Sequence, residues 1–238
     1  NFLLIIVSLG EEDDTFHVME VVPFTPPWVV HLNDHTDCIN PPPHTCRSRW
    51  RAHRGFSVDD LTHPVFLPVV SDETHGLFGE IRDLYPYTNM CIWQASELGS
   101  FMQHVPNLDV MIVEVEKLAA EAVYDDVRGL VVGRVVLLNP TEREYRLYGA
   151  GEHSLVIKDL VSESPLLEVD GVKAPSLEKI LVDAMVSPEL EFARGGELYT
   201  VFENAGEMYE IGRKAMLRYA SRRGLREEIE QMINATMV

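Results

Sequence analysis

The sequence predicts an α/β or α+β fold, in which a mixed sheet is flanked by helices and the C-terminal third is helical. Apolar runs alternate with amphipathic helical patterns from about Gly55 onward, which is typical of a sheet with helices on its faces. The composition, with 46% hydrophobic and 24% charged residues among 238, is that of a globular protein. No apolar run approaches the ~20 residues of a membrane span, and the net charge of −18 opposes non-specific binding to DNA or anionic lipid.

The N-terminal segment, residues 1–55, has a different composition from the rest. Up to residue 45 it contains no Lys or Arg, and it holds six of the fourteen prolines. Because proline breaks helices and lacks a backbone donor, we expect extended or loop-like, irregular structure over roughly the first 50 residues. The opening run 2–7 is either a buried strand or without structural meaning. An ordinary sequence begins near Gly55, so we place a second domain at residues 56–238.

The first half of that domain predicts alternating helices and strands. Ser71 is a good N-cap for a helix that carries Leu77, Phe78, Ile81 and Leu84 and that Pro86 ends. A short strand at 90–93, a helical stretch at 95–104, a strand at 108–115 and a helix at 116–127 follow, with Gly129 beyond the helix end. The apolar runs at 130–138 and 155–157 predict two more strands, the first covered on both faces.

The last third predicts four helices. Ser176 precedes an apolar stripe of helical spacing, with Lys179 and Asp183 four residues apart on the polar side. Further helices are expected at 197–209, at 213–223 with Gly224 as the glycine that ends it, and at 225–233.

Two metal sites are conceivable from the residue types. Zinc ligands are present at His31, His35, Cys38, His44 and Cys46, but their spacing matches no compact zinc motif, and the alternative is a proline-rich loop. A Mg²⁺-dependent nuclease of the restriction type needs an Asp and then an Asp/Glu-x-Lys unit on neighbouring strands. Asp109, Glu114, Glu116 and Lys117 approach this pattern, yet Val115 stands where the second carboxylate belongs. A strand that leads into a helix is the favoured interpretation.

Other chemistry-bearing motifs are missing from the sequence. It has no phosphate-binding glycine loop, no Gly-x-Ser-x-Gly and no His-Glu-x-x-His, so we expect no cofactor and no enzymatic activity. Three cysteines provide no disulfide framework, which favours the cytoplasm, and Cys91 between Met90 and Ile92 is expected to be a core thiol.

Basic residues gather near the C-terminus of this acidic chain: Arg213, Lys214, Arg218, Arg222, Arg223 and Arg226. Cations at a helix C-terminus stabilise its dipole, which is one explanation. The other is a surface for an anionic partner, because clustered Arg binds phosphate well.

Two segments in the C-terminal part are distinctive: Ser-Leu-Glu-Lys-Ile-Leu-Val-Asp at 176–183 and Leu-Arg-Tyr-Ala-Ser-Arg-Arg-Gly at 217–224. Further motif positions lie between about Gly55 and the end. Together the motif positions are Trp93, Phe101, His104, Glu114, Glu116, Lys117, Glu178, Lys179, Asp183 and Tyr219. On these residues the sequence resembles the AbiEi-type antitoxins of type IV toxin–antitoxin (abortive infection, phage defence) systems.

This resemblance implies a non-enzymatic antitoxin and transcriptional regulator, with an N-terminal winged helix that binds operator DNA and a C-terminal α/β domain that counters a nucleotidyltransferase toxin without a stable complex. The chain departs from the family at its front, where residues 1–45 lack the basic residues of a winged helix. The expected function is therefore that of the C-terminal antitoxin domain, with a degenerate or replaced winged-helix region. Residual DNA contacts could come only from Arg47, Arg49, Arg51 and Arg54.

Overall fold

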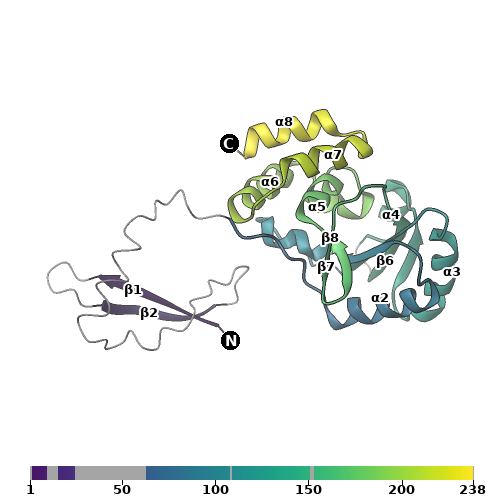
Figure 1. Cartoon of the computed structure of the whole chain (residues 1–238), viewed down its shortest axis with the longest axis horizontal. Helices are drawn as coiled ribbons and strands as arrows, with labels where there is room; N and C mark the ends of the chain where they lie inside the picture. Colours follow the sequence, from purple (N-terminus) through teal and green to yellow (C-terminus); the bar gives the residue numbers. More distant parts are fainter. Residues whose placement is uncertain (1, 10–15, 25–62, 108, 151–152, 238) are drawn as a thin grey trace. The chain divides into compact units, whose positions relative to one another are not determined.

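The computed structural model describes residues 2–9, 16–24, 63–107, 109–150 and 153–237. The chain divides into two compact units, Asn1–Leu61 and Thr62–Val238 (Figure 1). The division falls within a few residues of the boundary that the change in composition predicts.

The described part of the first unit is a pair of antiparallel strands, β1 (Phe2–Leu9) and β2 (Phe16–Phe24), whose register shifts between Ile6 and Val7. The composition predicts extended or loop-like backbone here, and the strand is one of the two interpretations of residues 2–7. The pairing of these two strands was not predicted.

A mixed four-stranded sheet forms the centre of the second unit, as the sequence predicts. Its strands are β3 (Met90–Gln94), β4 (Val110–Val115), β5 (Val135–Leu138) and β6 (Ser154–Asp159), in the order β3-β4-β6-β5. β3 is antiparallel to β4, whereas β4, β6 and β5 are parallel. The carboxyl ends of three strands therefore meet at one edge of the sheet, which is where open α/β sheets carry their ligand sites.

Two helices cover one face of the sheet (Figure 1): α2 (Asp72–Leu84) and α3 (Ala120–Leu130). Ser71 caps α2 by accepting a hydrogen bond from the backbone N–H of Thr74, as expected. Met111, Val113 and Val115 of β4 point into this layer and pack with apolar residues of both helices.

The opposite face carries the C-terminal helices, with Trp93 and Ile112 in the same core as their apolar residues (Figure 1). The elements on this side are η3 (Ala95–Phe101), α4 (Glu142–Tyr148), α5 (Leu177–Ala184), η4 (Pro188–Ala193), α6 (Gly196–Met208), α7 (Arg213–Arg223) and α8 (Arg226–Thr236). A hairpin of β7 (Leu166–Val169) and β8 (Val172–Pro175) precedes α5. None of the helices in the described ranges is long and apolar enough to span a bilayer.

The structure corrects several element boundaries. The helix expected at 116–127 begins only at Ala120 and includes Gly129, because residues 116–119 form a turn. The strand expected at 130–138 is confined to Val135–Leu138, because Leu130 still belongs to α3 and Val132 is 93% exposed. All four residues of this strand are only partly buried, so the expectation that it is covered on both faces is wrong. The stretch at 95–104 is a 3₁₀ helix that ends at Phe101. The hairpin, α4 and η4 were not predicted, although Thr141 and Glu144 form a capping box that the sequence displays.

Candidate functional site

Two charged side chains project from the carboxyl ends of neighbouring parallel strands. Glu114 of β4 lies beside Lys158 of β6 in the register of the sheet, and both are buried. Successive residues of a strand point to opposite faces of the sheet. The neighbours of Glu114 and Lys158 in β4 and β6 face α2 and α3, so Glu114 and Lys158 themselves face the C-terminal helices. The structure thus places two ionisable groups within the protein core, where each needs a partner of opposite charge.

Helix α5 supplies the partner for Glu114. The ammonium of Lys179 lies 2.5 Å from the Oε1 atom of Glu114 and 2.6 Å from the Oδ2 atom of Asp183, one turn further along α5. Trp93 also donates its indole N–H to Glu114, at 3.2 Å. Lys179 has no exposed surface and lies over the rings of Trp93 and Tyr219. One lysine therefore connects a strand with α5.

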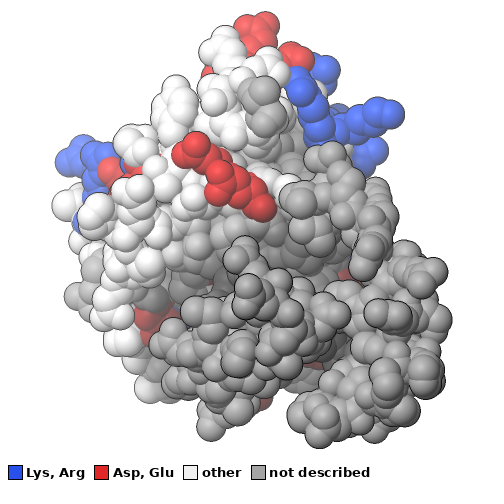
Figure 2. Space-filling model, turned by 90° about the vertical axis from the view of Figure 1, so that its left-hand side faces the viewer, with Lys and Arg blue, Asp and Glu red and all other residues white. Residues whose placement is uncertain are grey.

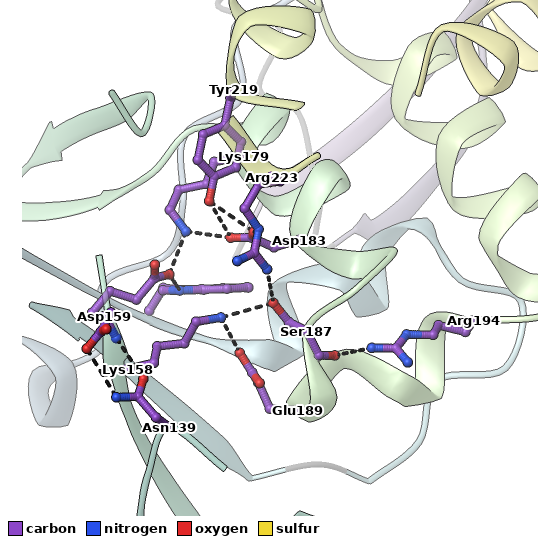
Figure 3. Close-up of polar contacts among 12 residues, drawn as sticks. Asn139, Lys158, Asp159, Lys179, Asp183, Ser187, Glu189, Arg194, Tyr219 and Arg223 are labelled. Carbon is purple, nitrogen blue, oxygen red and sulfur yellow. Dashed lines mark hydrogen bonds and ion pairs between the residues drawn. The ribbon is translucent and has the colours of Figure 1, made fainter. Parts of the chain in front are cut away.

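Helix α7 closes the cluster from the other side, as Figure 3 shows. The Tyr219 hydroxyl donates to Oδ1 of Asp183 at 3.0 Å, and the Arg223 guanidinium forms an ion pair with the same carboxylate at 3.1 Å. Arg223 also donates to the hydroxyl oxygen of Ser187 at 3.2 Å. Asp183 is therefore held by one residue of its own helix and two of α7.

Lys158 of β6 completes the arrangement by contacting two residues at the start of η4. Its ammonium donates to Oγ of Ser187 at 2.9 Å and forms an ion pair of 2.6 Å with Glu189 (Figure 3). Together these groups form what we call the ionic cluster: Trp93, Glu114, Lys158, Lys179, Asp183, Ser187, Glu189, Tyr219 and Arg223.

The formal charges of the ionic cluster cancel, because three carboxylates face three cations. Burial alone would lower the pKa of Lys179, but the charges of Asp183 and Glu114 outweigh it and raise that pKa. The pKa of Lys158 is also raised: burial opposes the shift, but the charges of Glu189, Glu114 and Asp183 together outweigh burial. Both amines are therefore held as ammonium ions, so that Lys158 cannot act as a base toward the hydroxyl of Ser187.

These contacts overturn one sequence expectation. Lys179 and Asp183 do not lie on a polar side of α5, because each side chain is at most 1% exposed. The sequence spacing correctly identifies an i,i+4 pair, but the predicted location of that pair on the polar side of the helix is wrong. Lys158, Ser187 and Glu189 were not singled out at all. The available signal was a charged residue inside an apolar strand, as in Leu-Val-Ile-Lys at 155–158.

The residues of the nuclease hypothesis do not converge. Asp109 precedes β4 and is bound to Arg134 and His153, whereas Glu114 lies near the far end of the same strand in its ion pair with Lys179. Glu116 accepts a hydrogen bond from the backbone of Asn89, and Lys117 is exposed in the turn that follows. In the described part of the chain no three Asp, Glu, His or Cys side chains are grouped to hold a metal ion.

Five of the motif positions that carry the family resemblance meet in the ionic cluster: Trp93, Glu114, Lys179, Asp183 and Tyr219. The others lie elsewhere. Phe101 belongs to the apolar core, His104 contacts Glu197 at the surface, and Glu178 accepts the backbone N–H of Gly212. Cys91 is buried, as expected, and burial raises the pKa of its thiol.

The predicted basic residues near the C-terminus separate into two groups. Arg223 points inward to the ionic cluster and Arg213 donates to Asn234, whereas the other four line a shallow groove on the outside of α7. This basic groove consists of Glu163, Lys214, Leu217, Arg218, Ser221, Arg222 and Arg226. On the face drawn in Figure 2, basic side chains gather in separate groups, one of them at the height of the C-terminal helices.

The remaining candidates lie outside the described residues. These are the possible zinc ligands His31, His35, Cys38, His44 and Cys46, and the possible DNA contacts Arg47, Arg49, Arg51 and Arg54.

Comparison with known proteins gives the chain a family but no activity. No curated protein matches the sequence. A family model does match residues 51–238, which contain the whole of the second unit and therefore both the ionic cluster and the basic groove. The protein belongs to this family, described as a family of unknown function (DUF6577).

Proposed function

We propose that the chain is a cytoplasmic, non-catalytic antitoxin of the AbiEi type, which counters a nucleotidyltransferase toxin through its C-terminal domain. The observation that carries the proposal is that the two most specific segments of the resemblance contact each other in the structure. Residues 176–183 lie on α5 and residues 217–224 on α7, and Lys179, Asp183, Tyr219 and Arg223 bind these helices to each other. The resemblance therefore covers one structural unit.

The chemistry of the ionic cluster supports a structural role for these residues. Its charges cancel, its amines are held protonated, and Lys179 has no exposed surface to offer a substrate. A catalytic centre needs a group that can exchange a proton or bind a reacting atom. The cluster instead fixes the position of α7, whose outer face carries the basic groove.

Co-expression with a nucleotidyltransferase toxin, chosen from the genomic neighbourhood of this chain where one is encoded there, tests the proposal. We expect growth to be restored in cells that produce the toxin, and we expect no stable complex when either protein is purified through a tag. Restored growth has to come from the folded protein, so circular dichroism of the purified chain accompanies the assay. A folded chain that never restores growth would refute the antitoxin proposal.

A nuclease assay with Mg²⁺ and Mn²⁺ tests the alternative activity. We expect no cleavage of DNA or RNA, because the carboxylates of Asp109 and Glu114 are engaged at opposite ends of β4. Metal-dependent cleavage that disappears in Asp109→Asn or Lys117→Ala would support the nuclease instead. Cleavage unchanged by both substitutions would point to a contaminating enzyme.

A further inference from the structure

The outer face of α7 presents a row of cations at regular spacing. Lys214, Arg218 and Arg222 are each four residues apart and exposed, and Arg226 continues the series at the start of α8. A step of four residues in an α-helix advances about 6 Å along the axis, so the three cations of α7 cover about 12 Å. All four side chains line the basic groove.

Three of these four cations have no acidic partner among the residues that the structure describes. Within the described ranges, Arg222 is the one member of the row with an ion pair, to Glu163. Arg226 bonds the hydroxyl of Ser221, and no described carboxylate pairs with Lys214 or Arg218. The net charge is −18, so carboxylates are plentiful elsewhere on the chain. Like charges four apart on a helix repel each other unless an anion lies between them.

Glu163 is the internal anion of the groove. It lies in the turn between β6 and β7 with a φ of 60°, a left-handed conformation that is costly for a residue with a side chain. Its carboxylate meets the guanidinium of Arg222 and so occupies a position that an external anion could take. Both side chains are about half exposed, at 48% and 46%, so that this ion pair is accessible to exchange.

We propose that the basic groove binds the phosphodiester backbone of a nucleic-acid strand, and that Glu163 competes with this strand for Arg222. The proposal deepens the antitoxin function by naming the class of partner, and it rests on that function only for its role in the cell. Three of the four cations are arginines, which bind phosphate through two parallel hydrogen bonds. Their even spacing fits a ligand whose charges also recur evenly.

The shape and lining of the groove favour a strand over other anions. The groove is open and shallow, whereas sites for a single small molecule enclose most of their ligand. A bound peptide of mixed composition would need apolar anchors, whereas an acidic peptide, which an Arg cluster can also bind, is distinguished by competition with poly-glutamate. Leu217 is the sole apolar side chain that lines the groove. Without an aromatic side chain in the lining, bases have no stacking platform, so we expect little preference for sequence.

Fluorescence anisotropy with labelled twelve-nucleotide probes of uridine and of thymidine tests binding and separates RNA from DNA. At physiological salt we expect dissociation constants in the range of about 10⁻⁴–10⁻⁶ M that is typical of binding without base readout, and tighter binding at low salt. Each phosphate contact on a single strand contributes about −0.7 to the slope of log K against log salt. Three to four contacts predict a loss of affinity of about 20- to 50-fold between 50 and 200 mM salt.

Two variants with opposite expected effects on the affinity make the test specific. Arg218→Glu with Arg222→Glu should weaken binding by at least about tenfold, because two phosphate contacts become repulsive. Glu163→Gln should tighten binding about two- to fivefold, because it releases Arg222 from a weak exposed ion pair. The matched controls lie on the opposite face of the sheet: Arg82→Glu with Arg128→Glu for the first variant, and Glu121→Gln for the second.

The proposal is overturned if both double variants weaken binding equally, or if Glu163→Gln leaves the affinity unchanged. It is also overturned if poly-glutamate competes as well as the oligonucleotide, since the groove would then recognise acidic peptides. Binding that follows the expected pattern in a chain that fails to restore growth would uphold the groove and refute the antitoxin function. Near-ultraviolet circular dichroism confirms that each exposed substitution leaves the fold intact.

Discussion

Lys179 connects the central sheet of the second unit to the C-terminal helices through buried ion pairs. It lies 2.5 Å from Glu114 of β4 and 2.6 Å from Asp183, which in turn is bound to Tyr219 and Arg223 of α7. The sequence shows that Lys179 and Asp183 are an i,i+4 pair, which on most helices is a solvated pair of small effect. The decisive partner, Glu114, is 65 positions away in the chain, so no local pattern reveals the burial.

Lys179→Met should destabilise the protein by about 3–5 kcal/mol, because it leaves the carboxylates of Glu114 and Asp183 buried without their shared cation. The measurement is the free energy of unfolding in urea. Adding Glu114→Gln and Asp183→Asn to Lys179→Met should recover part of the loss, since neutral side chains carry a smaller desolvation penalty. Equal stability of the single and triple variants would contradict the ion-pair explanation.

Glu97 should make stability depend on pH in the opposite direction from most carboxylates. Burial raises its pKa to about 7, although the backbone N–H of Val69 donates to it. A carboxyl whose folded pKa is above its unfolded value of 4.5 binds its proton more tightly in the folded state. Its contribution to stability is therefore complete below pH 4.5 and is lost as the pH rises toward 7.

Comparison of the native chain with Glu97→Gln between pH 4 and 8 isolates this effect. The free energy of unfolding of the native chain, relative to the variant, should fall over the window from 4.5 to 7. A difference that stays constant with pH would show that Glu97 titrates normally.

At the scale of elements, capping residues and helical periodicity predicted α2, α5, α6, α7 and α8, whereas α4, η4 and the hairpin of β7 and β8 were missed and β5 was predicted too long. Helix α7 has the bounds that the sequence indicates, and Gly224 adopts a φ of 72° beyond its end. β5 is shorter than its apolar run, since residues 131–134 lie outside any strand. Hydrophobicity alone does not indicate where within such a run a strand begins. The hairpin of β7 and β8 is only half-buried along β7, so its pattern is weak.

Gly224→Ala should cost about 1–2 kcal/mol, because the left-handed conformation places a Cβ too close to the following carbonyl. Gly76→Ala in α2 is the matched control with the opposite sign. A Cβ at Gly76 would meet nothing within 4 Å, and alanine is the better helix former by about 0.5–1 kcal/mol. Thermal unfolding of the two variants should therefore shift in opposite directions. A stabilised Gly224→Ala would show that α7 does not end as described.

At the scale of the whole molecule, the change in composition predicts a boundary near residue 55 and the units divide between Leu61 and Thr62. The candidate site, in contrast, needed the tertiary structure. The basic residues of α7 were recognised from sequence, whereas their division into an inward Arg223 and an outward groove depends on the packing of α7 against α5. Glu163 and Lys158 come from β6 and the turn after it. Their approach to α7 and η4 is set by the sheet, so spacing along the chain could not indicate it.

The boundary itself gives the last prediction. A fragment of residues 62–238 should unfold with the same stability as the full chain, because the second unit has its own core. A fragment of residues 71–238 should not. It lacks Phe66, which is 5% exposed and packs at ring-centroid distances of 6.0 Å from Phe101 and 5.3 Å from Tyr209. It also lacks the carbonyl of Pro64 that accepts the N–H of Glu210.

Urea unfolding of both fragments and of Phe66→Ala in the longer one separates these contributions. We expect Phe66→Ala to cost about 3–5 kcal/mol, as large buried aromatic side chains do when truncated. The shorter fragment should lose at least as much, because the hydrogen bond from Val69 to Glu97 is also absent. If the shorter fragment were as stable as the longer one, the segment from Pro64 to Val70 would be a linker and the boundary between the units would have to move to Ser71.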